Sequence, residues 1–331
     1  MSADLANARS SGLDGLRAAA CLAVVLFHSH SVAGISFGPL DPFVSGGDTG
    51  VWLFFSLSGY LLYRPFLTRR VDLRSYALKR AARILPAYYV ALAALVLLTG
   101  SPLPFEHPVA YLSIASSYQV PLRDFLGPAW TLSAEVLFYV SLPLIARLAA
   151  GRELLVLVAL GGTSIVASAV YQYTVRDATI WLNDAYPLVF YAFVPGMLLA
   201  VLEVRRPAAF AELVKPQYLL MGLLFLAIGM LTSVLPIDIG TLVGAPLVIG
   251  WLLQHQVRGA RLLAFAGGAS YALYLWNYDL IRTFGVTGVA IALIGAALSW
   301  GLVERPILNW AHRRAAVWRM AKVPDPAAAM T

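Results

Sequence analysis

Ten long apolar stretches constrain the fold of this chain more than any other feature of its sequence. A helix that crosses a bilayer needs about 20 mostly apolar residues, and ten stretches come close to that length: 16–34, 49–67, 82–100, 129–150, 152–173, 184–204, 216–235, 239–256, 261–282 and 284–305. Charged residues make up only 12% of the 331 residues, about half of the roughly 25% usual in soluble domains. The sequence therefore predicts an all-α polytopic bundle of about ten transmembrane helices.

The basic residues give these predicted spans an orientation. If the N-terminus is cytoplasmic, all but three of the 24 Lys and Arg residues lie on the cytoplasmic side, the exceptions being Arg123, Arg176 and Arg282. Short cytoplasmic loops of membrane proteins carry such an excess of positive charge. We therefore expect both termini in the cytoplasm and a multi-pass protein of the inner or plasma membrane.

One domain is predicted for almost the whole chain. Residues 1–306 form the transmembrane domain, and residues 307–331 form a short basic cytoplasmic tail that we expect to be disordered. Cys21 is the single cysteine, which excludes an intrachain disulfide and a thiolate metal site, so no metal is predicted. Because the net charge of +7 follows the cytoplasmic loops, we expect contact with membrane lipids and none with nucleic acid.

An arginine and a histidine share one face of the first predicted span. Arg17 and His28 are eleven residues apart, which separates them on a helix by roughly 20° in direction and ~16.5 Å in height. An ionisable side chain within a span is costly unless it faces a polar interior, so His28 is a candidate functional residue. A snorkelling arginine with a histidine bonded to a neighbouring helix is an equal alternative.

Other polar residues are predicted at the depth of His28. Glu135 lies about six residues from the outer end of its span, with Tyr139 on the same helix face. A histidine beside a carboxylate can act as a general base near neutral pH. We therefore predict His28 and Glu135 as the catalytic pair, with Glu135 orienting the ring and a substrate hydroxyl as nucleophile. The residues predicted to contact that substrate are Ser58, Tyr60, Trp130, Tyr139, Tyr271 and Asn277.

Some of these residues have structural alternatives. Ser58 and Gly59 are equally typical of small residues at close helix contacts, and Trp130 fits the aromatic belt at a membrane interface. Glu135 has no such alternative, because a carboxylate at that depth must be protonated, paired or hydrated.

Seven basic residues lie between positions 64 and 83. Lys79, Arg80 and Arg83 cluster at the cytoplasmic start of the third span, because residues three or four apart are neighbours on a helix. The cluster fits a topology signal that contacts anionic lipid. Together with Arg17 it also fits the phosphates of a cytoplasmic cofactor, whose arm would reach along the first span toward His28.

Six short motifs occur in one order over nearly the whole chain. They are Arg17 followed by ten residues and His28, FFSLSGYL (54–61), RAARILPAYY (80–89), WTLSAEVLFY (130–139), SYALYLWN (270–277) and VERP (303–306). Taken together, the chain resembles the acyltransferase-3 family of integral-membrane O-acyltransferases.

The resemblance implies transfer of an acyl group, acetyl by default, from cytoplasmic acyl-CoA to a hydroxyl of a glycan, glycolipid or other hydroxylated metabolite. It implies that Arg17 and His28 are essential, that Glu135 lies at the active site and that Arg80 and Arg83 act on the donor side of the site. Acyl-CoA would be a donor substrate, with no permanently bound cofactor. Family members usually have His where this chain has Asn277, an amide that can still orient a substrate oxygen.

One mechanistic choice and two alternative functions stay open at this point. His28 is either a general base or itself the carrier of the acyl group. A transporter or flippase that uses His28 and Glu135 for proton coupling is the alternative from another class. A non-catalytic partner or sensor is the third reading, for which Asn277 is the warning sign.

Overall fold

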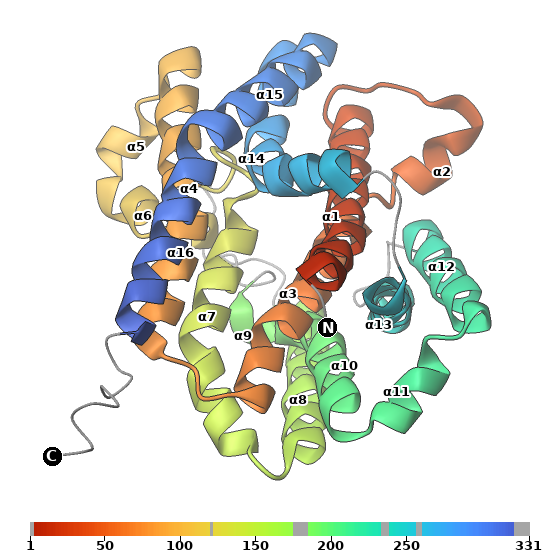
Figure 1. The fold of residues 1–331 in the computed structure, drawn as a ribbon. Coiled ribbons are helices and arrows are strands. Elements are labelled where there is room, and N and C mark those ends of the chain that lie inside the picture. Colours follow the sequence, from red (N-terminus) through yellow and green to blue (C-terminus); the bar gives the residue numbers. More distant parts are fainter. Residues whose placement is uncertain (1–2, 120–121, 175–184, 233–237, 256–259, 321–331) are drawn as a thin grey trace, which may run out of the picture.

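Helices joined by short turns make up this protein (Figure 1). The computed structural model describes residues 3–119, 122–174, 185–232, 238–255 and 260–320. The longer helices are α1 (Ala3–Ser31), α3 (Thr49–Thr68), α4 (Leu73–Thr99), α7 (Ala129–Ala149), α8 (Glu153–Thr174), α10 (Val194–Arg205), α12 (Pro216–Leu231), α13 (Ile239–Gln254), α14 (Ala260–Phe284), α15 (Val286–Ser299) and α16 (Arg305–Met320). Short helices connect them: α2 (Asp41–Val44), α5 (Leu103–Glu106), α6 (Pro108–Leu112), α9 (Tyr186–Val189) and α11 (Pro207–Leu213).

Local sequence signals set several helix ends. The carboxylate of Asp72, just before α4, accepts a hydrogen bond from the Ser75 backbone N–H at 3.0 Å. Asp238 caps α13 in the same way through the backbone N–H of Thr241, at 2.8 Å. Helix α4 ends at Gly100, whose φ of 66° is a left-handed conformation that favours glycine.

Five helical segments are long and apolar enough to cross a membrane: Ser11–Ser31, Leu73–Thr99, Ala129–Ala149, Glu153–Thr174 and Val286–Trp318. Two bent pairs, Tyr186–Arg205 with a 45° bend and Pro207–Leu231 with a 66° bend, raise the number to as many as seven. Helices α3 and α14 lie where spans are predicted but are not among these segments, because polar residues lower their hydropathy. The protein is thus all-α with five to seven candidate membrane spans.

Helix α1 packs against both α3 and α14. Helix α1 contacts α14, α3 and α13, while α3 also contacts α10 and α7. Helix α4 contacts α14, α7 and α16. Figure 1 shows the hairpin of α12 and α13 on one side of α1 and the pair α4 and α16 on the other. Polar residues on α1, α3, α4, α7 and α14 are therefore brought to one interior.

Helices α3 and α10 cross with their backbones in contact. A Cβ added at Gly196 of α10 would lie 1.7 Å from the carbonyl oxygen of Ser56. One added at Gly59 of α3 would lie 2.1 Å from the carbonyl oxygen of Phe193. Small residues allow this approach, which is common where helices pack in membranes. The contact brings Phe55 onto Phe193 in a stack with ring centres 4.5 Å apart, and it fixes the rotation of α3.

The C-terminal segment differs from the predicted disordered tail. Helix α15 continues through a π-helical turn, Trp300–Glu304, into α16, so that residues 286–318 form one apolar helical segment. Helix α16 packs on α4: Ala311 and Ala315 are fully buried, and the Arg74 guanidinium lies 4.0 Å from the centre of the Trp318 ring. The basic composition of this segment predicts disorder, whereas its contacts with α4 hold it as a helix. Residues 321–331 lie outside the described residues.

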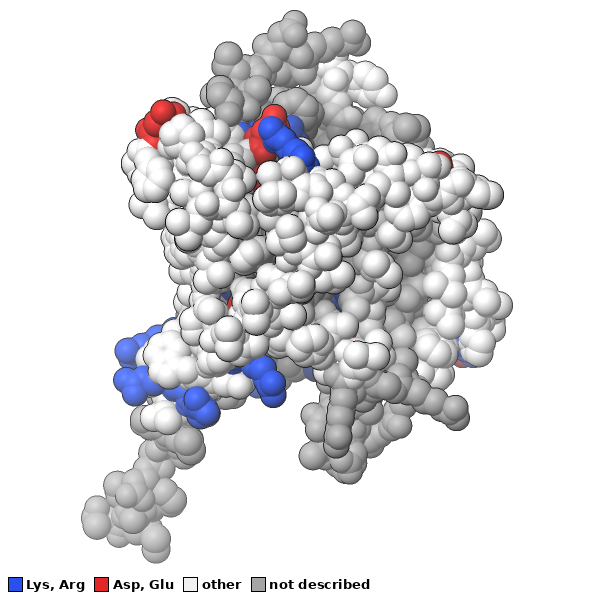
Figure 2. Space-filling view, turned by 90° about the horizontal axis from the view of Figure 1, so that it is seen from above, with Lys and Arg blue, Asp and Glu red and all other residues white. Residues whose placement is uncertain are grey.

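Charged side chains are sparse on the surface of the bundle. Figure 2 shows a face that is mostly free of them, with Lys and Arg gathered at one side and a small mixed group at the opposite side. Large apolar side chains such as Leu97, 85% exposed, and Val140, 73% exposed, cover much of the outside. Exposed apolar area of this extent is typical of a surface in contact with lipid.

We expect Gly196→Ala to destabilise the protein, because the added methyl group would push against the backbone of α3. Overpacking of this kind typically costs about 1–3 kcal/mol, and the midpoint of thermal unfolding in detergent would measure it. Gly162 on α8 is the matched control, since a Cβ there meets no atom within 4 Å. Gly162→Ala should leave the midpoint unchanged or raise it. Equal losses in both variants would contradict the close crossing of α3 and α10.

Candidate active site

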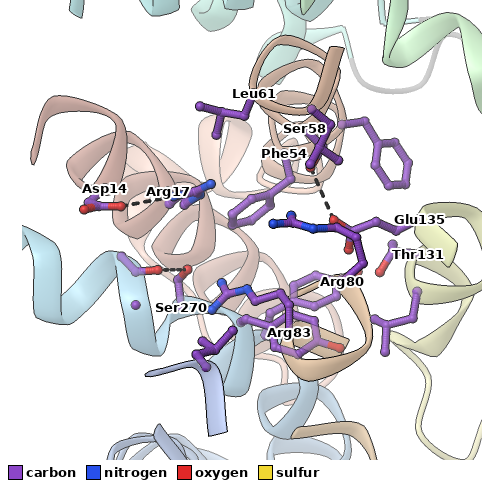
Figure 3. A pocket seen from close by; sticks show the side chains of 18 of the residues that line it. Asp14, Arg17, Phe54, Ser58, Leu61, Arg80, Arg83, Thr131, Glu135 and Ser270 are labelled. Carbon is purple, nitrogen blue, oxygen red and sulfur yellow. Dashed lines mark hydrogen bonds and ion pairs between the residues drawn. The ribbon is translucent and has the colours of Figure 1, made fainter. Parts of the chain in front are cut away.

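A cavity of about 430 Å³ lies among α1, α3, α4, α7 and α14 (Figure 3). Its polar lining comes from several helices and includes Asp14, Arg17, Ser58, Lys79, Arg80, Arg83, Glu135, Tyr139, Tyr271 and His312. Figure 3 shows Arg17, Arg80 and Arg83 around the same space as Glu135. We call it the arginine cavity.

Aromatic rings hold two of the arginines in this cavity. The Arg83 guanidinium lies 5.2 Å from the ring centre of Tyr271 and 5.9 Å from that of Trp300, and the Arg80 guanidinium lies 5.6 Å from that of Tyr139. Among the described residues, neither arginine forms a salt bridge, and the buried Nε of Arg80 has no hydrogen-bond partner. Because ring faces occupy no N–H donor, these guanidinium groups can still bind an anion.

Arg17 and Glu135 are held differently. Arg17 donates a hydrogen bond to the carboxylate of Asp14, one turn earlier on α1, at 3.0 Å. Glu135 Oε1 accepts hydrogen bonds from the Ser58 hydroxyl at 3.3 Å and from the Tyr139 hydroxyl at 2.5 Å. Asp14 and Glu135 both line the arginine cavity, where their carboxylates offset part of its positive charge.

A second cavity, of about 270 Å³, contains His28. We call it the histidine cavity. Its lining includes Val24, Phe27, His28, Asp48, Arg123, Asp124, Trp130 and Tyr278. The Tyr278 ring meets the imidazole edge-on, with ring centres 5.1 Å apart. His28 thus faces a partly polar space and has an aromatic wall beside it.

Asn277 fixes the tautomer of the neutral His28 ring. Its side-chain amide N–H groups donate to the carbonyl oxygens of Leu273 at 3.0 Å and Tyr274 at 2.7 Å. The amide oxygen therefore faces His28 Nδ1, which lies 2.5 Å away. Because that oxygen can only accept, Nδ1 must carry the proton, and the lone pair of the neutral ring is on Nε2. Nε2 forms no hydrogen bond within the described residues, so none of them occupies its lone pair.

This arrangement corrects the predicted partner of His28. The sequence predicts Glu135 as the group that orients the ring, whereas the hydrogen bonds of Glu135 go to Ser58 and Tyr139 and Asn277 holds the imidazole. Asn277 is fully buried, and its amide oxygen contacts the His28 ring. Glu135 and His28 are predicted at the same depth, but the two residues line different cavities.

The other predicted residues are distributed over three places. Arg17, Arg80, Arg83, Ser58, Tyr139 and Tyr271 line the arginine cavity, and Trp130 lines the histidine cavity. Tyr60 lines neither of these two cavities. Its hydroxyl donates to Glu203 of α10 at 2.7 Å, and the same carboxylate pairs with Arg64 at 2.6 Å. Tyr60 therefore belongs to a structural ion-pair cluster between α3 and α10.

Helical periodicity and motifs missed five ionisable residues of these cavities: Asp14, Asp48, Arg123, Asp124 and His312. Asp48 lies one turn before Val51 and directly precedes α3, so the i, i+3, i+7 pattern of that helix could have found it. Arg123 and Asp124 lie in the connection before α7, where no periodic signal exists.

The two cavities adjoin each other. Val51 of α3 and Tyr274 of α14 line both of them. Helix α1 contributes Arg17 to the first cavity and His28 to the second, as their spacing on one helix face predicts. A long ligand held by the arginines would therefore point toward the imidazole. Across the described residues, no three His, Cys, Asp or Glu side chains gather where they could hold a metal ion.

Known proteins resemble this chain over most of its length. It is 27% identical to "Exopolysaccharide production protein ExoZ" of Rhizobium meliloti (strain 1021), over 88% of this chain and 96% of that protein. It is 24% identical to "Putative O-acetyltransferase SAR0937" of Staphylococcus aureus (strain MRSA252), over 95% of this chain and 59% of that protein. It is 27% identical to "Putative peptidoglycan O-acetyltransferase YrhL" of Bacillus subtilis (strain 168), over 91% of this chain and 55% of that protein.

The chain therefore spans nearly all of the first relative but only a little more than half of the other two. No solved structure matches it. A family model described as an acyltransferase domain matches residues 10–310. Since that match covers most of the sequence, this chain belongs to the acyltransferase-3 family of membrane O-acyltransferases.

Proposed function

We propose that this protein transfers an acyl group, acetyl in the first instance, from cytoplasmic acyl-CoA to a hydroxyl of a cell-envelope glycan. The observation that carries the proposal is the hydrogen bond between His28 Nδ1 and Asn277 Oδ1, which leaves Nε2 as a base next to a cavity lined by three arginines. The relatives named for exopolysaccharide production and peptidoglycan O-acetylation support a glycan as acceptor.

In the proposed reaction His28 acts as general base and then as general acid. Nε2 takes the proton of the acceptor hydroxyl while the hydroxyl oxygen attacks the thioester carbonyl carbon. The carbon–sulfur bond then breaks, and the departing CoA sulfur receives the proton from Nε2, which gives an ester and a free thiol. Asn277 keeps Nδ1 protonated throughout and stabilises the imidazolium, as the orienting residue of a hydrolase triad does. It is a positioning residue in this scheme.

The arginine cavity is proposed to bind the donor. Arg17, Arg80 and Arg83 would pair with phosphate oxygens of CoA through charge-assisted hydrogen bonds. Ring contacts already hold Arg80 and Arg83 in place, so fewer rotamers are lost on binding. Glu135, bonded to Ser58 and Tyr139, would face the thioester arm from the opposite wall and act on the donor side of the reaction.

The membrane arrangement belongs to the same proposal. We propose ten spans, a cytoplasmic N-terminus and C-terminus, and a location in the cell membrane. Each predicted span contains a helix of the structure, and the excess of Lys and Arg in alternate loops supports the orientation. The arginine cavity would then open toward cytoplasmic acyl-CoA, and the histidine cavity would lie in the outer half of the membrane.

Variants with one added cysteine test this orientation. Cys21 is the only cysteine and is buried, so an added cysteine would react alone. In intact cells we expect a membrane-impermeant maleimide to label His107→Cys, in the outer connection, and to label Ala208→Cys only after permeabilisation. Both positions are exposed. Labelling of both residues from the same side would contradict the ten-span arrangement.

The reaction is tested with purified protein in nanodiscs, acetyl-CoA, and oligosaccharide fragments of peptidoglycan and exopolysaccharide. We expect release of free thiol only when an acceptor is present, together with the mass increase of one acetyl group on that acceptor. A glycan carried across a proteoliposome membrane without thiol release would instead favour a transporter.

His28→Ala should lower the turnover number by about 10²–10⁴-fold, the usual contribution of a general base. Asn277→Leu should also lower kcat, with little change in the KM for acetyl-CoA, because it removes the acceptor that fixes the Nδ1 proton. Asn277→Asp keeps an acceptor oxygen and should retain more activity than Asn277→Leu. His107→Ala and Asn309→Ala are matched controls at exposed positions. Full turnover by folded His28→Ala would refute the mechanism.

Arg80→Ala and Arg83→Ala should each raise the KM for acetyl-CoA by roughly 10- to 100-fold, since a hydrogen bond to a charged group contributes about 1.5–3 kcal/mol. Their kcat values at saturating donor should change little. Arg70→Ala, at an exposed position after α3, controls for a general loss of positive charge. A similar rise in KM with Arg70→Ala would show that the cavity does not bind the donor.

A further inference from the structure

The two cavities run end to end along the same helices. Along α3, Val51 and Phe54 come before Ser58, and they lie on the side of Ser58 that is nearer to His28. On α14, Tyr271 lines the arginine cavity, Tyr274 lines both cavities and Tyr278 lines the histidine cavity. Residues three or four apart share a helix face, so these side chains form a continuous wall from the arginines to the imidazole.

Three apolar and aromatic side chains lie where the arginine cavity adjoins the histidine cavity. Val51 and Tyr274 line both cavities, and each is only 7% exposed. Phe54 lines the arginine cavity, and its ring meets the ring of Tyr274 at 62° with centres 6.2 Å apart. Figure 3 shows Phe54 among the side chains that project into the arginine cavity. We call Val51, Phe54 and Tyr274 the partition.

The partition has a consequence for the donor, on the basis of the proposed function. If the arginines bind CoA and His28 is the base, then the thioester carbonyl must lie beside the partition. The acyl chain beyond that carbonyl must then fit between Phe54, Tyr274 and the acceptor. A methyl group needs little space there, whereas each further methylene group must displace a packed side chain, which is costly.

We propose that the partition, and Phe54 in particular, sets the length of the acyl group and makes the protein selective for acetyl donors over longer ones. Phe54 is suited to this role because it faces the donor cavity and packs on Tyr274. The proposal makes Phe54 a specificity-determining residue for the transferred group, separate from the base and from the arginines that bind the donor.

The test compares acetyl-CoA with butyryl-CoA as donors, using the oligosaccharide that accepts acetyl in the assay above. For the unaltered protein we expect kcat/KM to be much lower with butyryl-CoA. Phe54→Ala should raise the butyryl-to-acetyl ratio of kcat/KM by at least about ten-fold, the usual effect of room for one or two methylene groups in a pocket. Leu61→Ala is the matched control: Leu61 lines the same cavity from the same helix, about two turns from Phe54, and its loss should leave the ratio unchanged.

Each outcome separates this proposal from the proposed function. If the unaltered protein releases no thiol from acetyl-CoA, the proposed function fails first. If it turns over acetyl-CoA but Phe54→Ala leaves the ratio unchanged, or Leu61→Ala raises it equally, the role of the partition is refuted. Should Phe54→Ala not fold in detergent, Phe54→Leu and Val51→Ala enlarge the same space more gently, and an unchanged ratio in both would also overturn the proposal.

Discussion

The hydrogen bond between His28 and Asn277 is the interaction on which the candidate active site depends. Inside a membrane-spanning bundle, a polar side chain must find its partner within the protein. Asn277 meets this requirement with two backbone carbonyls of its own helix and with the ring of His28 on α1. The same bonds leave only one orientation for the amide and one tautomer for the ring. The hydrogen bonds that satisfy the buried amide thereby place the lone pair of the neutral His28 ring on Nε2.

The separation of the arginines from the imidazole also has a physical reason. A general base must carry a positive charge for part of the reaction, and nearby cations disfavour that charge. Arg80 and Arg83 lie in the neighbouring cavity beside aromatic rings, and Glu135 shares that cavity with them. Three arginines thus gather in the arginine cavity, whereas the histidine cavity has one arginine, Arg123, together with the carboxylates of Asp48 and Asp124.

Helical geometry explains both the successes and the failures of the sequence predictions. The spacing of Arg17 and His28 placed them on one side of α1, and the cluster of Arg80 and Arg83 was found because residues three apart are neighbours. Tyr60 does not line the cavity that Ser58 lines, because the two residues are two positions apart and differ by about 200° in direction around α3. One faces Glu203 and the other faces Glu135.

The sequence by itself determined which segments are apolar helices and which residues share a helix face, because hydropathy and the 3.6-residue period are local properties. Only the tertiary structure decided which faces meet. His28 and Asn277 are 249 residues apart in the chain, and their contact depends on how α1 packs against α14. Depth alone could not distinguish Asn277 from Glu135 as the partner of His28, since the rotation of each helix is set by packing contacts such as the backbone crossing at Gly59 and Gly196.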